Sequence, residues 1–134
     1  MKSSDKKIDK SKACLIMGAI GDALGAPIDF LNHEDITNKF GADGIIDFYP
    51  AFGKLGAITY DTQMKLFTAE GLLRGLVRRR ERCISGAEVT MVHDSCLCWL
   101  ESQKTPFNPE ITENNGWLIT LESLRFNIMR SIYR

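Results

Sequence analysis

The chain has 134 residues, 44% of them hydrophobic, and a formal net charge of zero. This length provides one domain at most, with a modest core, and the apolar content argues against global disorder. The balanced charge argues against a dedicated nucleic-acid binder, which usually carries a basic excess.

Cysteine use and the N-terminus bear on the compartment. Four cysteines do not make a disulfide framework at this length, and the polar N-terminus lacks the apolar region of a secretory signal. No uninterrupted apolar run reaches the length of a membrane span. We therefore expect a cytoplasmic protein that binds neither nucleic acid nor a membrane.

Residues 1–12 differ in composition from the rest of the chain. They contain five lysines, two aspartates and three serines, with little to anchor them in a core. This composition predicts a flexible polar tail, followed by a helical domain over residues 13–134.

Residues 13–24 have a helical pattern that is apolar nearly all round, which predicts a buried helix. Gly18, Gly21 and Gly25 share one side of it. Glycine costs about 1 kcal/mol in a helix relative to alanine, so we expect another backbone or a ligand to approach there. Asp22 is the sole charge in this run, and a hydrogen bond to a nearby loop is the preferred role for its carboxylate.

The remaining pattern predicts helices and loops without useful β alternation, so the fold class is all-α. Asn32 or His33 opens a short helix that Gly41 closes, and Ser85 with Glu88 forms a capping-box pattern. The predicted helices after the first cover residues 32–40, 61–82, 85–102 and 117–133, separated by loops at 41–56 and 104–116.

Arginines gather at the end of the helix predicted to finish near Arg82. Arg78, Arg79, Arg80 and Arg82 lie in its last turns, where cations complement the helix dipole. We prefer this interpretation to an RNA-binding patch.

A cluster of oxygen-bearing side chains precedes this helix. Thr59, Asp61, Thr62 and Gln63 lie within five positions at the helix start. Hydroxyls and a carboxylate there can cap the free N–H groups of the first turn, which is the commoner role. They can also bind Mg²⁺, which prefers oxygen ligands.

Two stretches resemble the signatures of one family. Gly18-Ala-Ile-Gly-Asp-Ala-Leu-Gly-Ala-Pro-Ile-Asp-Phe30 is similar to the first signature of the ADP-ribosylglycohydrolases, a family that includes the dinitrogenase-reductase-activating glycohydrolases and crystallin J1-like proteins. Gly56-Ala-Ile-Thr-Tyr-Asp-Thr-Gln-Met64 resembles the second, Thr-Asp-Asp-Thr-Gln-Met. Gly116-Trp117-Leu118 resembles a third marker.

This resemblance implies an orthogonal helical bundle like the N-terminal part of the family fold. Family members bind two Mg²⁺ (or Mn²⁺) ions and ADP-ribose in a cleft and hydrolyse the bond between ADP-ribose and a modified acceptor. By position, Thr59 and Asp61 would be metal ligands. Asp29 stands where the family has a glutamate beside the metals and the attacking water, which implies a catalytic role.

Three departures from the family pattern predict impaired turnover. Tyr60 replaces the first aspartate of the second signature, and its phenol is neutral near pH 7. Asp29 is one methylene shorter than glutamate. The family's later Asp-x-Asp metal motif has no counterpart, so we expect a truncated domain.

Three alternatives follow from the sequence. The chain could be a Mg²⁺-dependent hydrolase acting on ADP-ribosylated protein, or an inactive module that binds ADP-ribose or a protein. In the third, another chain or a second copy covers apolar faces that missing helices would normally cover.

Overall fold

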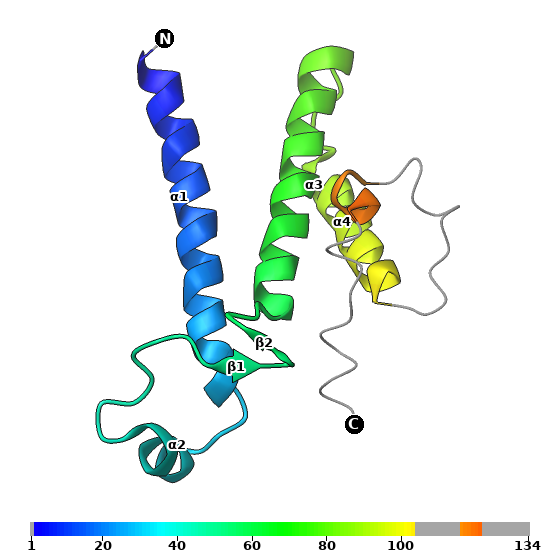
Figure 1. The fold of residues 1–134 in the computed structure, drawn as a ribbon. Coiled ribbons are helices and arrows are strands. Elements are labelled where there is room, and N and C mark those ends of the chain that lie inside the picture. Colours follow the sequence, from blue (N-terminus) through cyan, green and yellow to red (C-terminus); the bar gives the residue numbers. More distant parts are fainter. Residues whose placement is uncertain (1, 104–115, 122–134) are drawn as a thin grey trace. The chain divides into compact units, whose positions relative to one another are not determined.

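The computed structural model describes residues 2–103 and 116–121 (Figure 1). Contacts divide the chain into two compact units, Met1–Thr62 and Gln63–Arg134, here named the N-terminal and C-terminal units. The described residues are mostly helical, which confirms the all-α class. In chain order the elements are α1 (Lys2–Gly25), the 3₁₀ turn η1 (Ala26–Ile28), α2 (His33–Phe40), β1 (Pro50–Ala51), β2 (Lys54–Leu55), α3 (Tyr60–Arg82), α4 (Glu88–Ser102) and η3 (Leu118–Thr120).

Helix α1 begins at Lys2, so most of the residues predicted to form a flexible tail are helical. Asp5 lies in the first turn, where a carboxylate complements the helix dipole. The Ser11 hydroxyl donates to the Lys7 carbonyl at 3.0 Å, and lysine is a good helix former. The predicted helix start at residue 13 was therefore wrong, whereas the division into domains stays a prediction.

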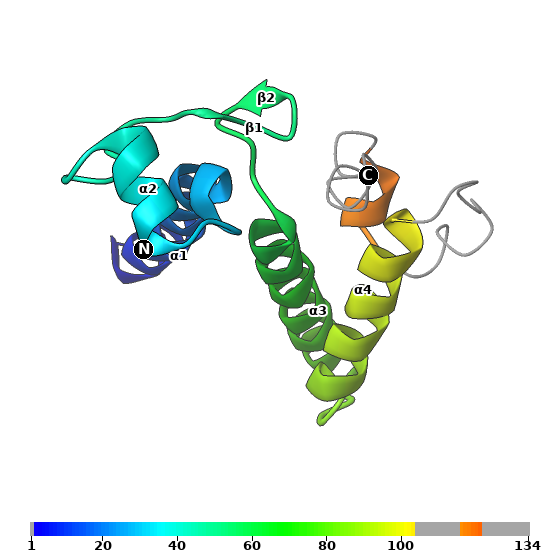
Figure 2. The same cartoon turned by 90° about the horizontal axis from the view of Figure 1, so that it is seen from below.

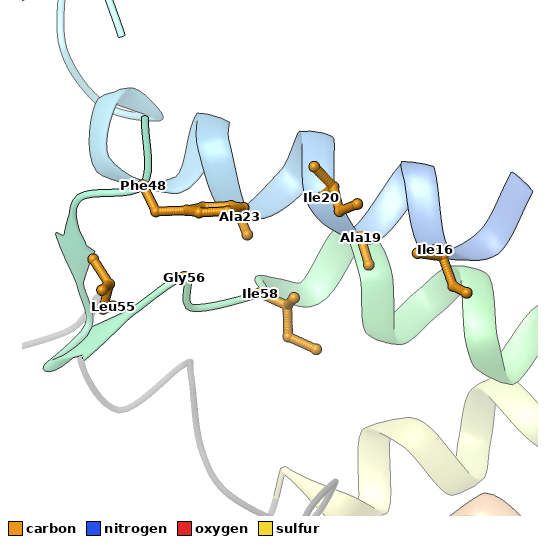
Figure 3. Close-up of a pocket in the computed structure, with 8 residues that line it drawn as sticks. All are labelled: Ile16, Ala19, Ile20, Ala23, Phe48, Leu55, Gly56 and Ile58. Atoms are coloured by element: carbon orange, nitrogen blue, oxygen red, sulfur yellow. The ribbon is translucent and has the colours of Figure 1, made fainter. Parts of the chain in front are cut away.

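The apolar part of α1 is less covered than its composition suggested. Ile16 is 59% exposed and Met17 64% exposed, whereas Ala23 and Ala26 are buried. The prediction of a buried helix was wrong, because uniform hydropathy says nothing about which residues are available to cover it. Within the part of the chain that is described, the apolar segment around Phe48 and Ile58 lies against it (Figure 3).

Asp5–Ile28 is also long and apolar enough to cross a membrane by length and composition, and its most apolar 18-residue window has a mean hydropathy of 1.2. The expectation that no stretch reaches this length does not hold on these two criteria. The core helix of a soluble protein and an N-terminal signal sequence pass the same test, so the finding is weak evidence for a membrane span. The absence of a membrane partner stays a prediction.

Helix α2 has the ends that its sequence predicts. The Asn32 side chain accepts from the Asp35 N–H at 2.9 Å at the N-terminus. Gly41 closes the helix with φ of 87°, and its N–H donates to the Thr37 carbonyl.

A two-stranded hairpin interrupts the loop predicted over residues 41–56. Strand β1 pairs antiparallel with β2, with Pro50 opposite Leu55. Phe52 and Gly53 form the turn, with φ values of 49° and 78°. Two consecutive positive φ angles are typical of the tight turns that join antiparallel strands. Strands of two residues give no alternation for a sequence pattern to reveal.

In the C-terminal unit, two glycines of α3 allow close packing against α4 (Figure 2). A Cβ added to Gly71 would lie 2.4 Å from the Val92 Cα, and one added to Gly75 would lie 2.9 Å from the Glu88 Cα. By contrast, a Cβ on Gly21 or Gly25 would meet none of the described residues within 4 Å. The predicted approach of another backbone is therefore not found at these two α1 glycines among the described residues, and the approach of a ligand stays a prediction.

A small core and a buried carboxylate join α3, α4 and η3. Phe67, Cys98 and Ile119 form the buried apolar cluster. Glu70 is 3% exposed. It accepts the backbone N–H groups of Trp117 at 2.9 Å and Leu118 at 3.0 Å, which fixes the start of η3.

Two helix boundaries in this unit differ from the predictions. Helix α4 ends at Ser102 as expected but begins at Glu88, after an Ala87 N-cap without a side-chain cap, so the Ser85 capping box is not formed. Residues 118–120 form a 3₁₀ turn and Leu121 is extended, so the helix predicted from residue 117 does not begin there. The rest of that prediction, and residues 104–115 of the predicted loop, lie outside the described residues.

Two glycine substitutions test the close packing. We expect Gly71→Ala to destabilise the protein by about 1–3 kcal/mol, since the new methyl group meets the α4 backbone. Gly21→Ala is the matched control, with open space around it, and should be neutral or stabilising by up to about 1 kcal/mol. Urea denaturation followed by circular dichroism measures both. Equal stability of the two variants would contradict the packing described.

Candidate functional site

The Asp22 carboxylate joins the end of α1 to the start of α3, within the N-terminal unit. Its Oδ1 accepts the Thr59 hydroxyl at 2.6 Å, and its Oδ2 accepts the Thr59 N–H at 2.8 Å. Oδ2 also accepts the Thr62 hydroxyl at 2.5 Å and the Thr62 N–H at 3.2 Å. These four hydrogen bonds, named the Asp22 junction below, confirm the structural role predicted for this carboxylate.

The same contacts set the ionisation of Asp22. Burial by itself would raise the pKa of this carboxyl, but the hydroxyls and backbone N–H groups of Thr59 and Thr62 outweigh it and hold the pKa below its ordinary value. The carboxylate is therefore ionised at neutral pH. All four donors point at it, which suits an anchor better than an acid that must gain and lose a proton.

Thr59 also caps α3. It is 3% exposed and directly precedes Tyr60, the first helical residue. Its Oγ1 donates to Asp22 and accepts the Asp61 N–H at 3.2 Å. This confirms capping as one role of the oxygen cluster. A hydroxyl has two acceptor lone pairs, so one remains for a further partner.

The two predicted site carboxylates are on the surface. Asp61 is exposed in the first turn of α3, where the helix dipole favours a negative charge. Asp29 is exposed directly after η1. Neither carboxylate receives a hydrogen bond from the residues that the structure describes. The junction thus brings Thr59 to Asp22, and the roles predicted for Asp29, Thr59 and Asp61 stay predictions.

An open apolar groove lies beside the junction (Figure 3). Its volume is about 470 Å³. Helix α1 contributes Ile16, Ala19, Ile20 and Ala23, and the segment leading to α3 contributes Phe48, Leu55, Gly56 and Ile58. None of these side chains can ligate a metal or transfer a proton, so the groove offers packing surface rather than chemistry.

The donor set near the junction is compatible with Mg²⁺ in kind but sparse. Within residues 2–103 and 116–121, no group of three or more His, Cys, Asp or Glu side chains could hold a metal. Thr59 offers one oxygen lone pair and Asp61 offers a carboxylate. Because Mg²⁺ commonly takes one or two carboxylates and keeps several waters, this set fits part of a coordination sphere.

Comparison with known proteins identifies the family. The ADP-ribosylglycohydrolase family model matches residues 3–130. The chain belongs to the ADP-ribosylglycohydrolase family. The Asp22 junction therefore connects the first signature, which contains Asp22, to the second, which contains Thr59 and Thr62.

The match to an individual protein covers less of the chain than the family model does. An uncharacterized protein from Archaeoglobus fulgidus is 37% identical over 68 residues, which is 48% of this chain. The aligned part of this chain spans only 22% of that protein's length. No solved structure matches the chain.

Sequence reasoning identified Asp22 and Thr59 as polar residues that need partners but not as partners of each other. They are 37 residues apart, with η1, α2 and the β1–β2 hairpin between them. Thr62 was predicted as a candidate cap or Mg²⁺ ligand, not as a partner of Asp22. One signal could have connected them. A lone carboxylate in an apolar helix needs several hydrogen-bond donors, and the free N–H groups at the start of another helix supply such donors.

The pH dependence of Asp22→Asn tests the junction. Because the folded-state pKa is depressed, the carboxylate stabilises the fold above its unfolded pKa of about 4, and this stability is lost as pH falls. We expect Asp22→Asn to cost roughly 1.5–3 kcal/mol at pH 7 and clearly less at pH 3. Urea denaturation at both values measures it. A cost that does not change with pH would contradict an ionised Asp22.

Proposed function

We propose that this chain provides an ADP-ribosylglycohydrolase-type site for Mg²⁺-dependent hydrolysis of ADP-ribose from a modified acceptor, with reduced turnover. The observation that carries the proposal is the Asp22 junction, which holds the second signature at the end of the first with four hydrogen bonds. Family membership supplies the reaction class.

Three side chains have proposed roles. The Asp61 carboxylate and the remaining Thr59 lone pair would hold Mg²⁺ (or Mn²⁺). Bound there, the cation would lower the pKa of a water and stabilise developing charge. The exposed Asp29 carboxylate would orient that water and accept its proton. Thr59 is buried and fixed by Asp22, so its oxygen is already oriented, whereas Asp61 and Asp29 are exposed.

Reduced turnover follows from Tyr60. This residue is 38% exposed at the first position of α3, beside Thr59 and Asp61. It stands where the family signature has an aspartate, so cation binding lacks that carboxylate ligand. The aligned part of this chain spans only 22% of its archaeal relative, and further ligands could come from another chain.

A second candidate function is supported by exposed apolar surface. Ile16 and Met17 are more than half exposed on α1, and the groove of Figure 3 is almost wholly apolar. An inactive module that binds ADP-ribose, a protein partner or a second copy of itself would use such surface. Ligand binding without hydrolysis would favour this function over the first.

Substitutions at the start of α3 test the cation site. Tyr60→Asp should strengthen Mg²⁺ binding in calorimetry, because it adds a carboxylate beside Asp61. Asp61→Ala should weaken binding and abolish any release of ADP-ribose from ADP-ribosyl-arginine. Asp43→Ala removes an equally exposed acid outside both signatures and should change neither.

The outcomes separate the candidates. Release that needs Mg²⁺ and Asp61 supports the hydrolase. Binding of ADP-ribose without release supports the binding module. If Tyr60→Asp and Asp43→Ala bind Mg²⁺ with the same affinity as the unaltered chain, the cation site is not at the start of α3.

A further inference from the structure

A second, chemically different pocket lies in the C-terminal unit, about five helical turns after Asp61 along α3. Its volume is about 200 Å³. Arg74, Arg78 and Arg82 recur every four residues and so share one face of the helix. The complete lining is Arg74, Val77, Arg78, Glu81, Arg82, Met91 and Trp117.

The charge of this lining is positive. It contains three guanidinium groups and one carboxylate, that of Glu81. Arg74 is already paired with Glu70, at 3.5 Å between Nη1 and Oε1. The excess charge that a ligand could use therefore comes from Arg78 and Arg82.

Arg78 carries the observation that points to a ligand. Its Nε is buried and has no hydrogen-bond partner among residues 2–103 and 116–121. A buried donor on a charged group is costly to leave unpaired, and most such donors in proteins have an acceptor. If these arginines served only to complement the helix dipole, their donors would be solvated, as expected for the exposed Arg80. The dipole explanation therefore accounts for Arg80 but not for Arg78.

We propose that this pocket binds a small oxyanion of the phosphate class. The planar guanidinium of Arg78 would present Nε and one Nη to two oxygens, and Arg82 would supply the second positive charge. The indole of Trp117, half exposed at the pocket, would cover one side of the anion.

The pocket's volume suits a small ligand. Pockets for drug-sized molecules usually have volumes of about 300–1,000 Å³, and this one is smaller. It fits a phosphate group rather than a whole nucleotide sugar such as ADP-ribose. The site is therefore independent of the function proposed above and uses none of its residues.

Calorimetric titration with sodium phosphate tests the proposal. The buffer contains EDTA, so that no divalent cation brings phosphate to the protein, and chloride keeps the ionic strength constant. We expect saturable binding of one phosphate per chain. Arg78→Gln should weaken it on the order of tenfold or more, since a hydrogen bond to a charged group is lost.

Arg80→Gln is the matched control, because it removes the same charge from the same stretch of α3 but does not line the pocket. It should leave phosphate affinity unchanged. Equal weakening by both variants would show a diffuse charge effect and overturn the site, as would a lack of saturable binding. Circular dichroism checks that each variant is folded.

Two further variants keep the proposal testable if Arg78→Gln does not fold. Arg78→Lys retains the charge but not the two parallel donors, so phosphate should bind more weakly. Trp117→Phe should remove a phosphate-dependent change in fluorescence, leaving only Trp99. Unaltered affinity in Arg78→Lys, or an unaltered fluorescence response in Trp117→Phe, would contradict the proposed geometry.

Discussion

The N-terminal unit depends on the Asp22 carboxylate, which accepts four hydrogen bonds and so has a structural role. Asp22 ends an otherwise apolar segment, and Thr59 and Thr62 surround it with two hydroxyls and two backbone N–H groups. These contacts offset the cost of burying the charge and also satisfy donors that a helix start leaves unpaired. The capped helix then presents Asp61 at its positive end. Asp22 thus joins the family's first and second signatures by hydrogen bonds, and this role does not require it to take part in hydrolysis.

The C-terminal unit uses the same physical solution. Glu70 is buried and accepts two consecutive backbone N–H groups, those of Trp117 and Leu118. In both units an acid from a helix holds a segment that is distant in sequence. Asp22 and Glu70 are therefore structural, and the proposed chemistry is left to exposed acids such as Asp29 and Asp61.

Sequence patterns predicted those features, such as helix ends and fold class, that depend on residues close together in the chain. The ends of α3 near Arg82 and of α4 at Ser102 follow from helical periodicity and turn residues, and the all-α class follows from the lack of alternation. Contacts between distant residues were less accessible. The sequence showed that the Asp22 carboxylate needs hydrogen-bond donors, but it did not show which residues supply them. Glycines on α1 and α3 looked alike, yet only Gly71 and not Gly21 has a second helix against it. For the site, the signature residues indicated which side chains are candidate ligands. Whether these side chains lie close together depends on tertiary geometry, which spacing along the chain does not encode.

The Asp22 junction also determines how the intervening chain can change. It closes a loop of 37 residues between Asp22 and Thr59. The entropy of closing a flexible loop grows only with the logarithm of its length, so an insertion of about ten residues would cost a few tenths of a kcal/mol. The exposed stretch between α2 and β1 is therefore a permissive place for inserting an epitope or a labelling sequence. Evolution could likewise lengthen this loop without loosening the two helix ends that it connects.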